Sequence, residues 1–507
     1  MKADCKDRKW WILVAMAIAL SLVFIDQTAV SIALPQMQRD LNTSNQILHW
    51  IINAYLLSLA AVVIFGGKLG DLFGHRYTFL IGTIIFILAS LSCTVAESGM
   101  WIIISRAIQG IGGAFMIPAT GAIVINAFSE EERVRAMGIY IGIASIALSV
   151  GPLLSGALTQ FLSWRWVFGI NLPLALFSIS LTLKFILKEE ERTEIVSIDW
   201  LGFILLAVCV TCFILALMEV FDFGWASLLI WSLFAISFLA AIAFIMVEKR
   251  LKNPLVELDI FKNRLFTMTV LMLIIMRATF ISFIFWMVFL QNVIGFSPGM
   301  VGLSVLPVTL PLILGSRFSS YLGDRFGPRM SISFGAAFVV ASMLWVGMTS
   351  WTHNYVYMFP GFLLLGLATP LVVSNSMVTG VAAVEAHQRG VGSGILRASR
   401  QLGSSIGLAI IGSVISYVNQ IKISNWLSHA TGSLAQIHGS QINGILAGTT
   451  SSRQVVAQLS PQEVNVIHAV AVHAYTFAFS SGMYMAALIA FIGFFLALQI
   501  PRCQSAD

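Results

Sequence analysis

The residues of this sequence that are best placed to do chemistry are ionisable side chains inside long apolar segments. Asp26 lies well inside the run that begins at Trp10, and Arg106 lies within residues 100–125. A charged side chain in hydrocarbon costs at least ~2.5 to 3.5 kcal/mol, so it is usually functional and turned inward. A carboxylate shielded from water can take up and release protons. The pair predicts proton coupling; the alternatives are a structural aspartate and an arginine that reaches the membrane surface.

Four further side chains are expected to line a substrate cavity. Gln109 follows Arg106 by three residues, so both lie on one face of a helix. Arg277 is embedded in the apolar run 266–291. We add Trp286 and Asn375 to this set.

The composition places these residues in a membrane. Of the 507 residues, 58% are hydrophobic and only 10% are charged, and the mean hydropathy is +0.90. Soluble domains contain about 25% charged residues, and a run of about 20 apolar residues can cross the bilayer as a helix. We therefore expect an all-α integral membrane protein with fourteen transmembrane helices near residues 10–33, 47–66, 77–96, 100–125, 136–160, 166–187, 199–219, 227–247, 266–291, 299–320, 329–350, 355–383, 391–418 and 475–499.

An internal repeat divides the chain. The sequence LGDLFGHR at 69–76 recurs as LGDRFGPR at 322–329, an offset of 322 − 69 = 253. Repeats of this kind build two helix bundles that rock about a central site. We expect a six-helix bundle over 1–187, a linker and two inserted helices over 188–250, and a second bundle over 251–507 with an external loop at 419–474.

The repeated segments are short polar turns, and their glycines let the chain reverse between closely packed helices. We interpret them as gates rather than ordinary charged turns. The gate motif comprises Gly67, Gly70, Asp71, Gly74 and Arg76, with Asp324 and Arg329 in the second copy.

The repeat also predicts a role for Arg277. Adding 253 to 26 gives position 279, so Arg277 lies almost opposite Asp26 in the second half. We expect Arg277 either to pair with Asp26 or to attract an anionic group of the substrate. A structural arginine bonded to helix carbonyls is the alternative.

The fifth span contains Gly151, Pro152 and Gly156. Proline removes a backbone hydrogen bond and bends a helix, and small residues permit close helix contact. We expect this segment to set the bend of the span and to limit leakage. Generic small-residue packing explains the glycines alone.

The distribution of positive charge predicts orientation. With the N-terminus inside, only Arg39, Arg165, Lys422 and Arg453 fall in external loops, so both termini are expected in the cytoplasm. The basic start followed by an apolar run is too long for a cleaved signal, so we interpret it as a retained first span. Near the last span, Ser460 and Glu463 form a capping-box pattern that predicts a helix start.

Several kinds of chemistry are not expected. The chain has no phosphate-binding loop of the GxxxxGK[ST] type, which argues against ATP as the energy source. No metal site and no cofactor are expected, because Cys209 and Cys212 lie in an apolar span without a second pair or a histidine ligand. We expect no nucleic acid partner.

Together the motifs resemble those of the major facilitator superfamily, and with residues 164–173 (WRWVFGINLP), 291–307 and 400–403 (RQLG) they are similar to its fourteen-span drug:proton antiporters. By this resemblance Asp71 and Arg76 belong to the gate motif and Arg106 to a proton-coupling position. Gly151, Pro152 and Gly156 match the antiporter motif. Ser31 and Arg397 stand where the family often has asparagine.

The resemblance implies a proton-driven exporter of amphiphilic drugs or lipid-like small molecules in a bacterial inner membrane. Its partners would be the substrate, protons and membrane lipid, and the sequence leaves open whether a periplasmic adaptor and an outer-membrane channel join it. Proton-coupled uptake or export of one metabolite is an alternative, although the antiporter motif argues against uptake. An integral-membrane enzyme is a third, against which stands the absence of HExxH or a Ser/His/Asp-like cluster.

Overall fold

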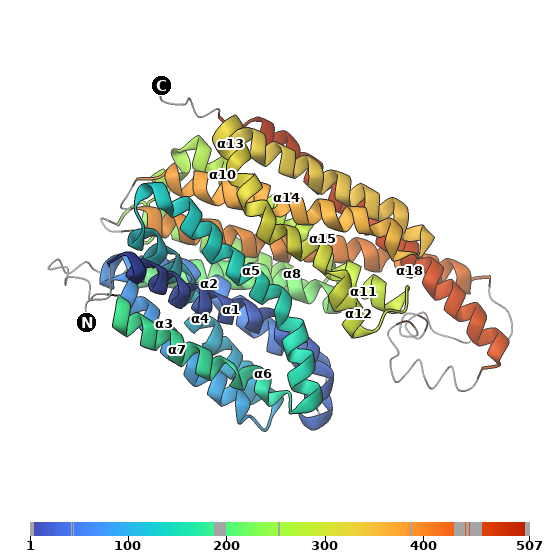
Figure 1. The fold of residues 1–507 in the computed structure, drawn as a ribbon. Coiled ribbons are helices and arrows are strands. Elements are labelled where there is room, and N and C mark those ends of the chain that lie inside the picture. Colours follow the sequence, from blue (N-terminus) through green and yellow to red (C-terminus); the bar gives the residue numbers. More distant parts are fainter. Residues whose placement is uncertain are drawn as a thin grey trace.

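The computed structural model of the protein describes residues 5–41, 43, 45–186, 199–251, 254–385, 388–429, 442, 446 and 459–501. Within these ranges every regular element is a helix, and twelve segments are long and apolar enough to cross a membrane. Figure 1 shows that the helices run side by side in two groups, and that α1 begins at the same end of the molecule at which α18 finishes. We call this end the terminal end.

The first group contains seven helices, of which α6 and α7 together form one candidate span. It begins the chain and occupies the lower part of Figure 1. Its members are α1 (Cys5–Leu41), α2 (Asn45–Phe73), α3 (His75–Thr94), α4 (Gly99–Ala127), α5 (Glu130–Phe161), α6 (Arg165–Gly169) and α7 (Asn171–Phe185).

The second group ends the chain. It consists of η1 (Leu258–Lys262), α10 (Arg264–Phe280), α11 (Phe283–Asn292), α12 (Pro298–Ser304), α13 (Leu306–Thr349), η2 (Ser350–Thr352), α14 (Tyr355–Ala382), α15 (Arg389–Leu427) and α18 (Pro461–Leu498). Helix α18 begins where the capping box predicts a helix start, because Ser460 and Glu463 exchange both hydrogen bonds.

Between the two groups the chain forms α8 (Trp200–Phe223) and α9 (Leu228–Glu248), which pack against each other. Helix α8 also contacts α2 of the first group and α15 of the second. Val210 and Ile214 of α8 join Ala60 of α2 in a small buried cluster, against which Leu402 of α15 packs. The inserted pair therefore touches both bundles. The charged segment 188–197 lies outside the described residues.

The backbone repeats as the sequence does. Gly74 separates α2 from α3 with φ 94°, and Gly327 interrupts α13 with φ 80°. These two glycines are equivalent, since 74 + 253 = 327. Only glycine adopts such angles without strain. Helix α13 is thus two helical segments joined at the second copy of the motif.

The described residues contain twelve candidate spans, whereas the sequence predicts fourteen. The predicted spans 136–160 and 299–320 fall in α5 and in α12 and the first part of α13, which are helical but are not among the twelve. The number fourteen and the domain boundaries stay predictions.

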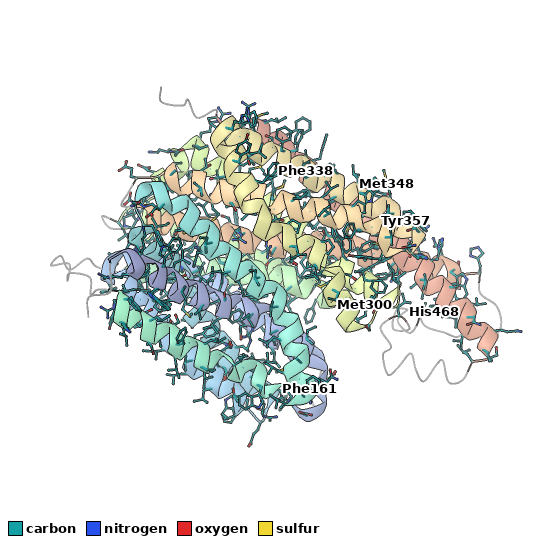
Figure 2. The ribbon with its side chains drawn as sticks, viewed as in Figure 1. Phe161, Met300, Phe338, Met348, Tyr357 and His468 are labelled. Carbon is teal, nitrogen blue, oxygen red and sulfur yellow. The ribbon has the colours of Figure 1, made fainter. Side chains whose placement is uncertain are left out.

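The packing suits a bilayer. One apolar core fills the first group and another fills the second, and a third cluster joins them through residues such as Ile64 of α2 and Ile395 of α15. Large apolar side chains also cover the outside, as Phe161 (77% exposed) and Met348 (62% exposed) show in Figure 2. An apolar surface of this extent marks contact with membrane or protein rather than water.

Candidate functional site

Asp26 of α1 and Arg106 of α4 form a buried ion pair inside the first bundle. Nη1 of Arg106 donates to Oδ2 of Asp26, and each residue is only 1% exposed. Arg106 therefore does not reach the membrane surface, which excludes that alternative. The sequence predicted both residues as functional but did not predict that they touch.

Polar side chains from three further positions complete the network around the carboxylate. Gln109 accepts from Nη1 of Arg106 at 2.6 Å and donates to Oδ1 of Asp26 at 3.0 Å and to Ser90 at 2.8 Å. Asn171, the first residue of α7, donates to the same Asp26 oxygen at 3.3 Å. Both Asp26 oxygens thus have partners, and the charge is matched by Arg106. Gln109 belongs to this network rather than to an open substrate cavity, because it is fully buried.

The guanidinium of Arg106 is also held from α2. Its Nε donates to the Ile51 carbonyl at 3.1 Å, and its Cζ lies 4.1 Å from the centroid of the Tyr55 ring. The Tyr55 hydroxyl in turn donates to the Val23 carbonyl on α1 at 3.3 Å. Five helices, α1, α2, α3, α4 and α7, therefore contribute to the network around one ion pair.

Sequence reasoning assigned no role to Ser90 or Asn171. Asn171 stands in an apolar segment, and a polar amide in such a place is a signal that could have been used. Ser90 carries no such signal, since serines are common in transmembrane helices.

Arg277 does not lie beside Asp26, where the first form of the hypothesis placed it. It lies on α10, its Nε donates to Ser404 of α15 at 2.9 Å, and its Cζ is 5.0 Å from the centroid of the Phe280 ring. The ion-pair partner of Asp26 is Arg106, so the pairing of Arg277 with Asp26 is not what the structure shows. The repeat offset aligned helix positions but carried no information about which partner lay nearer.

Trp286 and Asn375, both expected in a substrate cavity, have structural partners instead. Trp286 is fully buried in the core of the second bundle, where it stacks on Phe362 at 4.5 Å. The amide of Asn375 donates to Ser319 at 2.7 Å and Ser331 at 2.8 Å, which ties α14 to both segments of α13. These contacts leave the Trp286 ring no accessible surface for a ligand.

The gate motif is tightly packed in its first copy. A Cβ on Gly70 would lie 2.5 Å from Nδ1 of His75, and His75 lies 3.7 Å from Asp71 in an i,i+4 pair. Lys68, next to Gly67, donates to the Pro254 carbonyl at 3.1 Å and so ties the turn to the segment before the second bundle.

In the second copy, a Cβ on Gly323, the equivalent of Gly70, would lie 2.7 Å from Oδ1 of Asn375. The side chain of Asp324 lies outside the described residues, and Arg329 is partly buried. Gate roles for these residues, for Gly74 and for Arg76 stay predictions.

The glycines of the fifth span differ from each other. A Cβ on Gly151 would lie 2.3 Å from Oγ1 of Thr28 on α1, whereas a Cβ on Gly156 would meet nothing within 4 Å. Helix α5 is continuous through both positions. Gly151 is therefore a close helix contact, and Gly156 is not. The side chain of Pro152 is outside the described residues.

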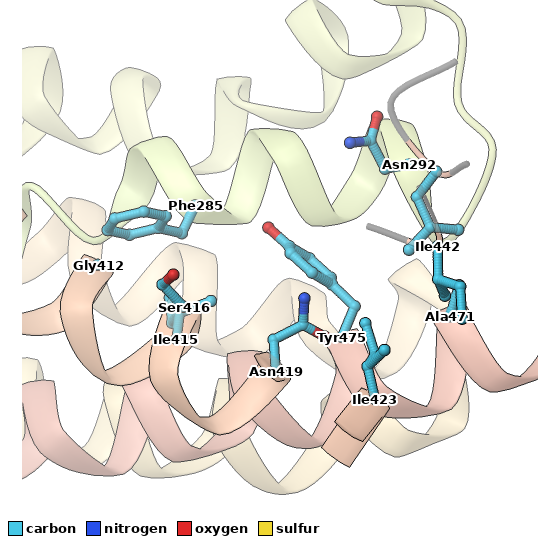
Figure 3. A pocket seen from close by; sticks show the side chains of 11 residues that line it. Phe285, Asn292, Gly412, Ile415, Ser416, Asn419, Ile423, Ile442, Ala471 and Tyr475 are labelled. Carbon is cyan, nitrogen blue, oxygen red and sulfur yellow. The ribbon is translucent and has the colours of Figure 1, made fainter. Parts of the chain in front are cut away.

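A pocket of about 400 Å³ opens at the end opposite the terminal end, inside the second bundle. Figure 3 shows Phe285 and Asn292 of α11 on one side of it, Ser416 and Asn419 of α15 on the other, and Tyr475 of α18 projecting between them. None of the predicted site residues lines it. The described residues contain no group of three potential metal ligands.

Comparisons with known proteins identify the family and the fold. The sequence model of the Major Facilitator Superfamily matches residues 16–408. The chain is 31% identical over 423 residues to the tetracenomycin C resistance and export protein of Streptomyces glaucescens (83% of this chain, 79% of that protein). It is 30% identical over 438 residues to the puromycin resistance protein pur8 of Streptomyces alboniger (85% and 86%). It is 30% identical over 406 residues to the multidrug resistance protein Stp of Mycobacterium tuberculosis (80% and 75%).

The fold is similar to that of the human organic anion transporter MFSD10 (TETRAN), with a TM-score of 0.60 over 98% of this chain and 100% of that one. The sequences are 13% identical, so this likeness concerns the fold alone.

Proposed function

Because this chain belongs to the Major Facilitator Superfamily, we propose that it exports amphiphilic drugs or other toxic, lipid-like small molecules in exchange for protons. Its relatives of about 30% identity are a tetracenomycin C resistance and export protein, a puromycin resistance protein and a multidrug resistance protein. A proton that crosses about 100 mV releases ~2.3 kcal/mol, which corresponds to roughly a fiftyfold concentration ratio of a neutral substrate.

The observation that carries the proposal is the buried network of Asp26, Arg106 and Gln109. An isolated carboxylate in a dry bundle is costly unless it is paired or protonated. Asp26 can meet this requirement in two ways. The positive charge of Arg106 balances the ionised carboxylate, and a bound proton removes the charge altogether. Protonation removes the attraction that holds α1 to α4 through this pair.

Such an exchange links protonation to packing. Once Asp26 is neutral, Arg106 retains its bonds to Ile51 and Gln109 but loses its anionic partner. A buried guanidinium without a counter-charge is strongly disfavoured, so the protonated state favours a rearrangement that gives Arg106 water or another anion. We propose that this rearrangement drives the rocking of the two bundles between their two access states.

We further propose that the protein works in the plasma membrane with both termini in the cytoplasm, and that it has no enzymatic activity. In a cell with an outer membrane, the proposal extends to a periplasmic adaptor and an outer-membrane channel. The orientation is tested by placing single cysteines in the segment 188–197 and labelling them from each side of the membrane.

Export itself is tested in everted membrane vesicles from a host that lacks its own drug pumps. Respiration acidifies the vesicle lumen, and addition of a drug that is exchanged for protons partly collapses the gradient, as a pH-sensitive dye reports. We expect this response with the wild-type protein, and we expect an uncoupler to abolish drug accumulation in the vesicles. Accumulation that persists with an uncoupler would contradict proton exchange.

A further inference from the structure

We propose that Arg277, Arg397 and Arg400 form a binding site for the anionic head group of an amphiphile, a carboxylate, sulfonate or phosphate with an apolar body. This inference rests on the proposed export function and specifies the substrate class. The three arginines come from α10 and α15 of the second bundle.

Packing of α10 against α15 fixes two of the arginines beside each other. A Cβ on Gly403 would lie 2.2 Å from the Ile274 carbonyl oxygen, and a Cβ on Gly407 would lie 1.9 Å from that of Ala278, so the two backbones touch. Arg277 donates to Ser404, whose hydroxyl donates to the Arg400 carbonyl at 3.1 Å. Ser404 therefore holds the Arg277 guanidinium one helical turn from Arg400 on α15.

The third arginine reaches the other bundle. Arg397 precedes Arg400 by three residues and so shares its helix face. Its Nη2 lies 2.9 Å from the position that a Cβ on Gly121 of α4 would occupy, and its charge acts on the hydroxyl of Tyr140 on α5. The site thus lies where the two bundles meet, and an anion bound there would contact the element that must move.

The charges of this cluster are unbalanced. Arg400 experiences the positive charges of both Arg277 and Arg397. Among the described residues, no ion pair joins any of the three to a carboxylate, and Asp26 is already paired with Arg106. Like charges held together in a partly buried place repel each other, and an anion between them would remove that repulsion.

Unused hydrogen-bond donors point to the same ligand. Nε of Arg397 and Nε of Arg400 are buried without a hydrogen-bond partner. A guanidinium presents several donors in a planar fork that matches two oxygens of a carboxylate, sulfonate or phosphate. A merely structural arginine would use these donors on helix carbonyls, whereas the bond that Arg277 makes is to a serine side chain. Phe280, beside Arg277, offers an apolar contact for the body of the ligand.

A pair of probes that differ in charge tests the site. Dansylglycine is an anion and dansylcadaverine is a cation, and both carry the same fluorophore, which brightens in an apolar site. With the full-length protein in zwitterionic nanodiscs, we expect dansylglycine to bind at least about tenfold more tightly than dansylcadaverine. Removing a charge-assisted hydrogen bond costs about tenfold or more in affinity, so Arg277→Gln and Arg400→Gln should each remove most of this preference.

The matched control is Arg264→Gln, which removes an exposed arginine from the same helix as Arg277. It should leave both affinities unchanged. Arg277→Lys keeps the positive charge and should retain part of the preference, which keeps the test informative if a glutamine variant does not fold. Equal affinity of the wild-type protein for the two probes, or an equal preference in wild type, Arg277→Gln and Arg400→Gln, would overturn the proposal.

The anion could belong to a free amphiphile or to a lipid head group. Nanodiscs with added phosphatidylglycerol separate these sources. If this lipid weakens dansylglycine binding to the wild type but not to Arg277→Gln, the lipid head group occupies the site; if it weakens neither, the ligand is a free amphiphile. Both results support the anion site.

This binding needs no proton gradient. A protein that shows the charge preference but no proton-dependent export would contradict the proposed function alone. Proton-dependent export without the preference would contradict the anion site alone.

Discussion

A single nitrogen of Arg106, Nη1, donates both to the Asp26 carboxylate on α1 and to the Gln109 side chain one turn further along α4. Because Gln109 also donates to Asp26, the three side chains form a closed ring of hydrogen bonds. Any change in the charge of Asp26 is therefore transmitted to both neighbours at once. The first two predictions concern this ring.

Asp26→Asn should abolish uphill, proton-dependent export while leaving drug binding measurable. The amide keeps the shape and can still accept from Arg106, but it cannot exchange a proton. We expect the drug-induced pH response in everted vesicles to fall to that of empty vesicles. Asp259→Asn is the matched control, because Asp259 is an exposed residue whose ion pair with Lys262 lies on the same surface segment. Full proton-dependent efflux by Asp26→Asn would move the coupling role to another residue.

Arg106→Lys should export poorly although it preserves the charge. Lysine cannot bond the Ile51 carbonyl, Asp26 and Gln109 simultaneously in the geometry of the planar guanidinium. We expect at least about a tenfold lower export rate, equivalent to ~1.4 kcal/mol in the barrier. Arg264→Lys on the surface should behave as wild type. Comparable rates for Arg106→Lys and wild type would show that charge alone suffices.

Gly151→Leu should block turnover, whereas Gly156→Leu should not. The two positions lie five residues apart on α5, yet only Gly151 faces a close neighbour, the Thr28 hydroxyl. Overpacking at such a contact costs about 1–3 kcal/mol. The measurement is export rate normalised to the amount of protein in the membrane. Thr28→Ala should partly rescue Gly151→Ala, and equal effects of leucine at both glycines would refute this close-contact role.

Gly74→Ala and Gly327→Ala should destabilise the protein by similar amounts, about 1–3 kcal/mol each, because both glycines combine a positive φ with an extended ψ, a region that a Cβ disfavours. Thermal unfolding in detergent, followed by tryptophan fluorescence, should show a lower midpoint for each. Gly138→Ala is the control: it lies inside helix α5 with open space around it, so alanine there should not destabilise. A drop for only one of the two glycines would argue against equivalent turns.

The helices and the superfamily were predictable from sequence because length, hydropathy and repeated glycine motifs act locally. The capping box at Ser460 and the paired turns at Gly74 and Gly327 are of this kind. The partners of the charged residues inside the spans were not predictable from sequence, because these contacts depend on how the helices rotate and pack. Asp26 and Arg277 are nearly equivalent by the repeat offset, yet Asp26 pairs with Arg106 of its own bundle. Trp286 likewise could not be assigned to core or cavity without knowing which face of α11 turns inward.

Helix α8 lies against both α2 and α15, whereas at the other seam α5 meets α13 directly, with no helix inserted between them in the described part of the chain. The two seams between the bundles are therefore unequal. Acyl chains of the surrounding lipid can contact the α5/α13 seam, whereas α8 occupies the other. A hydrophobic compound dissolved in one leaflet would thus reach the bundle interface more directly along α5 and α13 than along α9, so substitutions along α5 and α13 should alter which compounds enter from the membrane more than substitutions along α9 do.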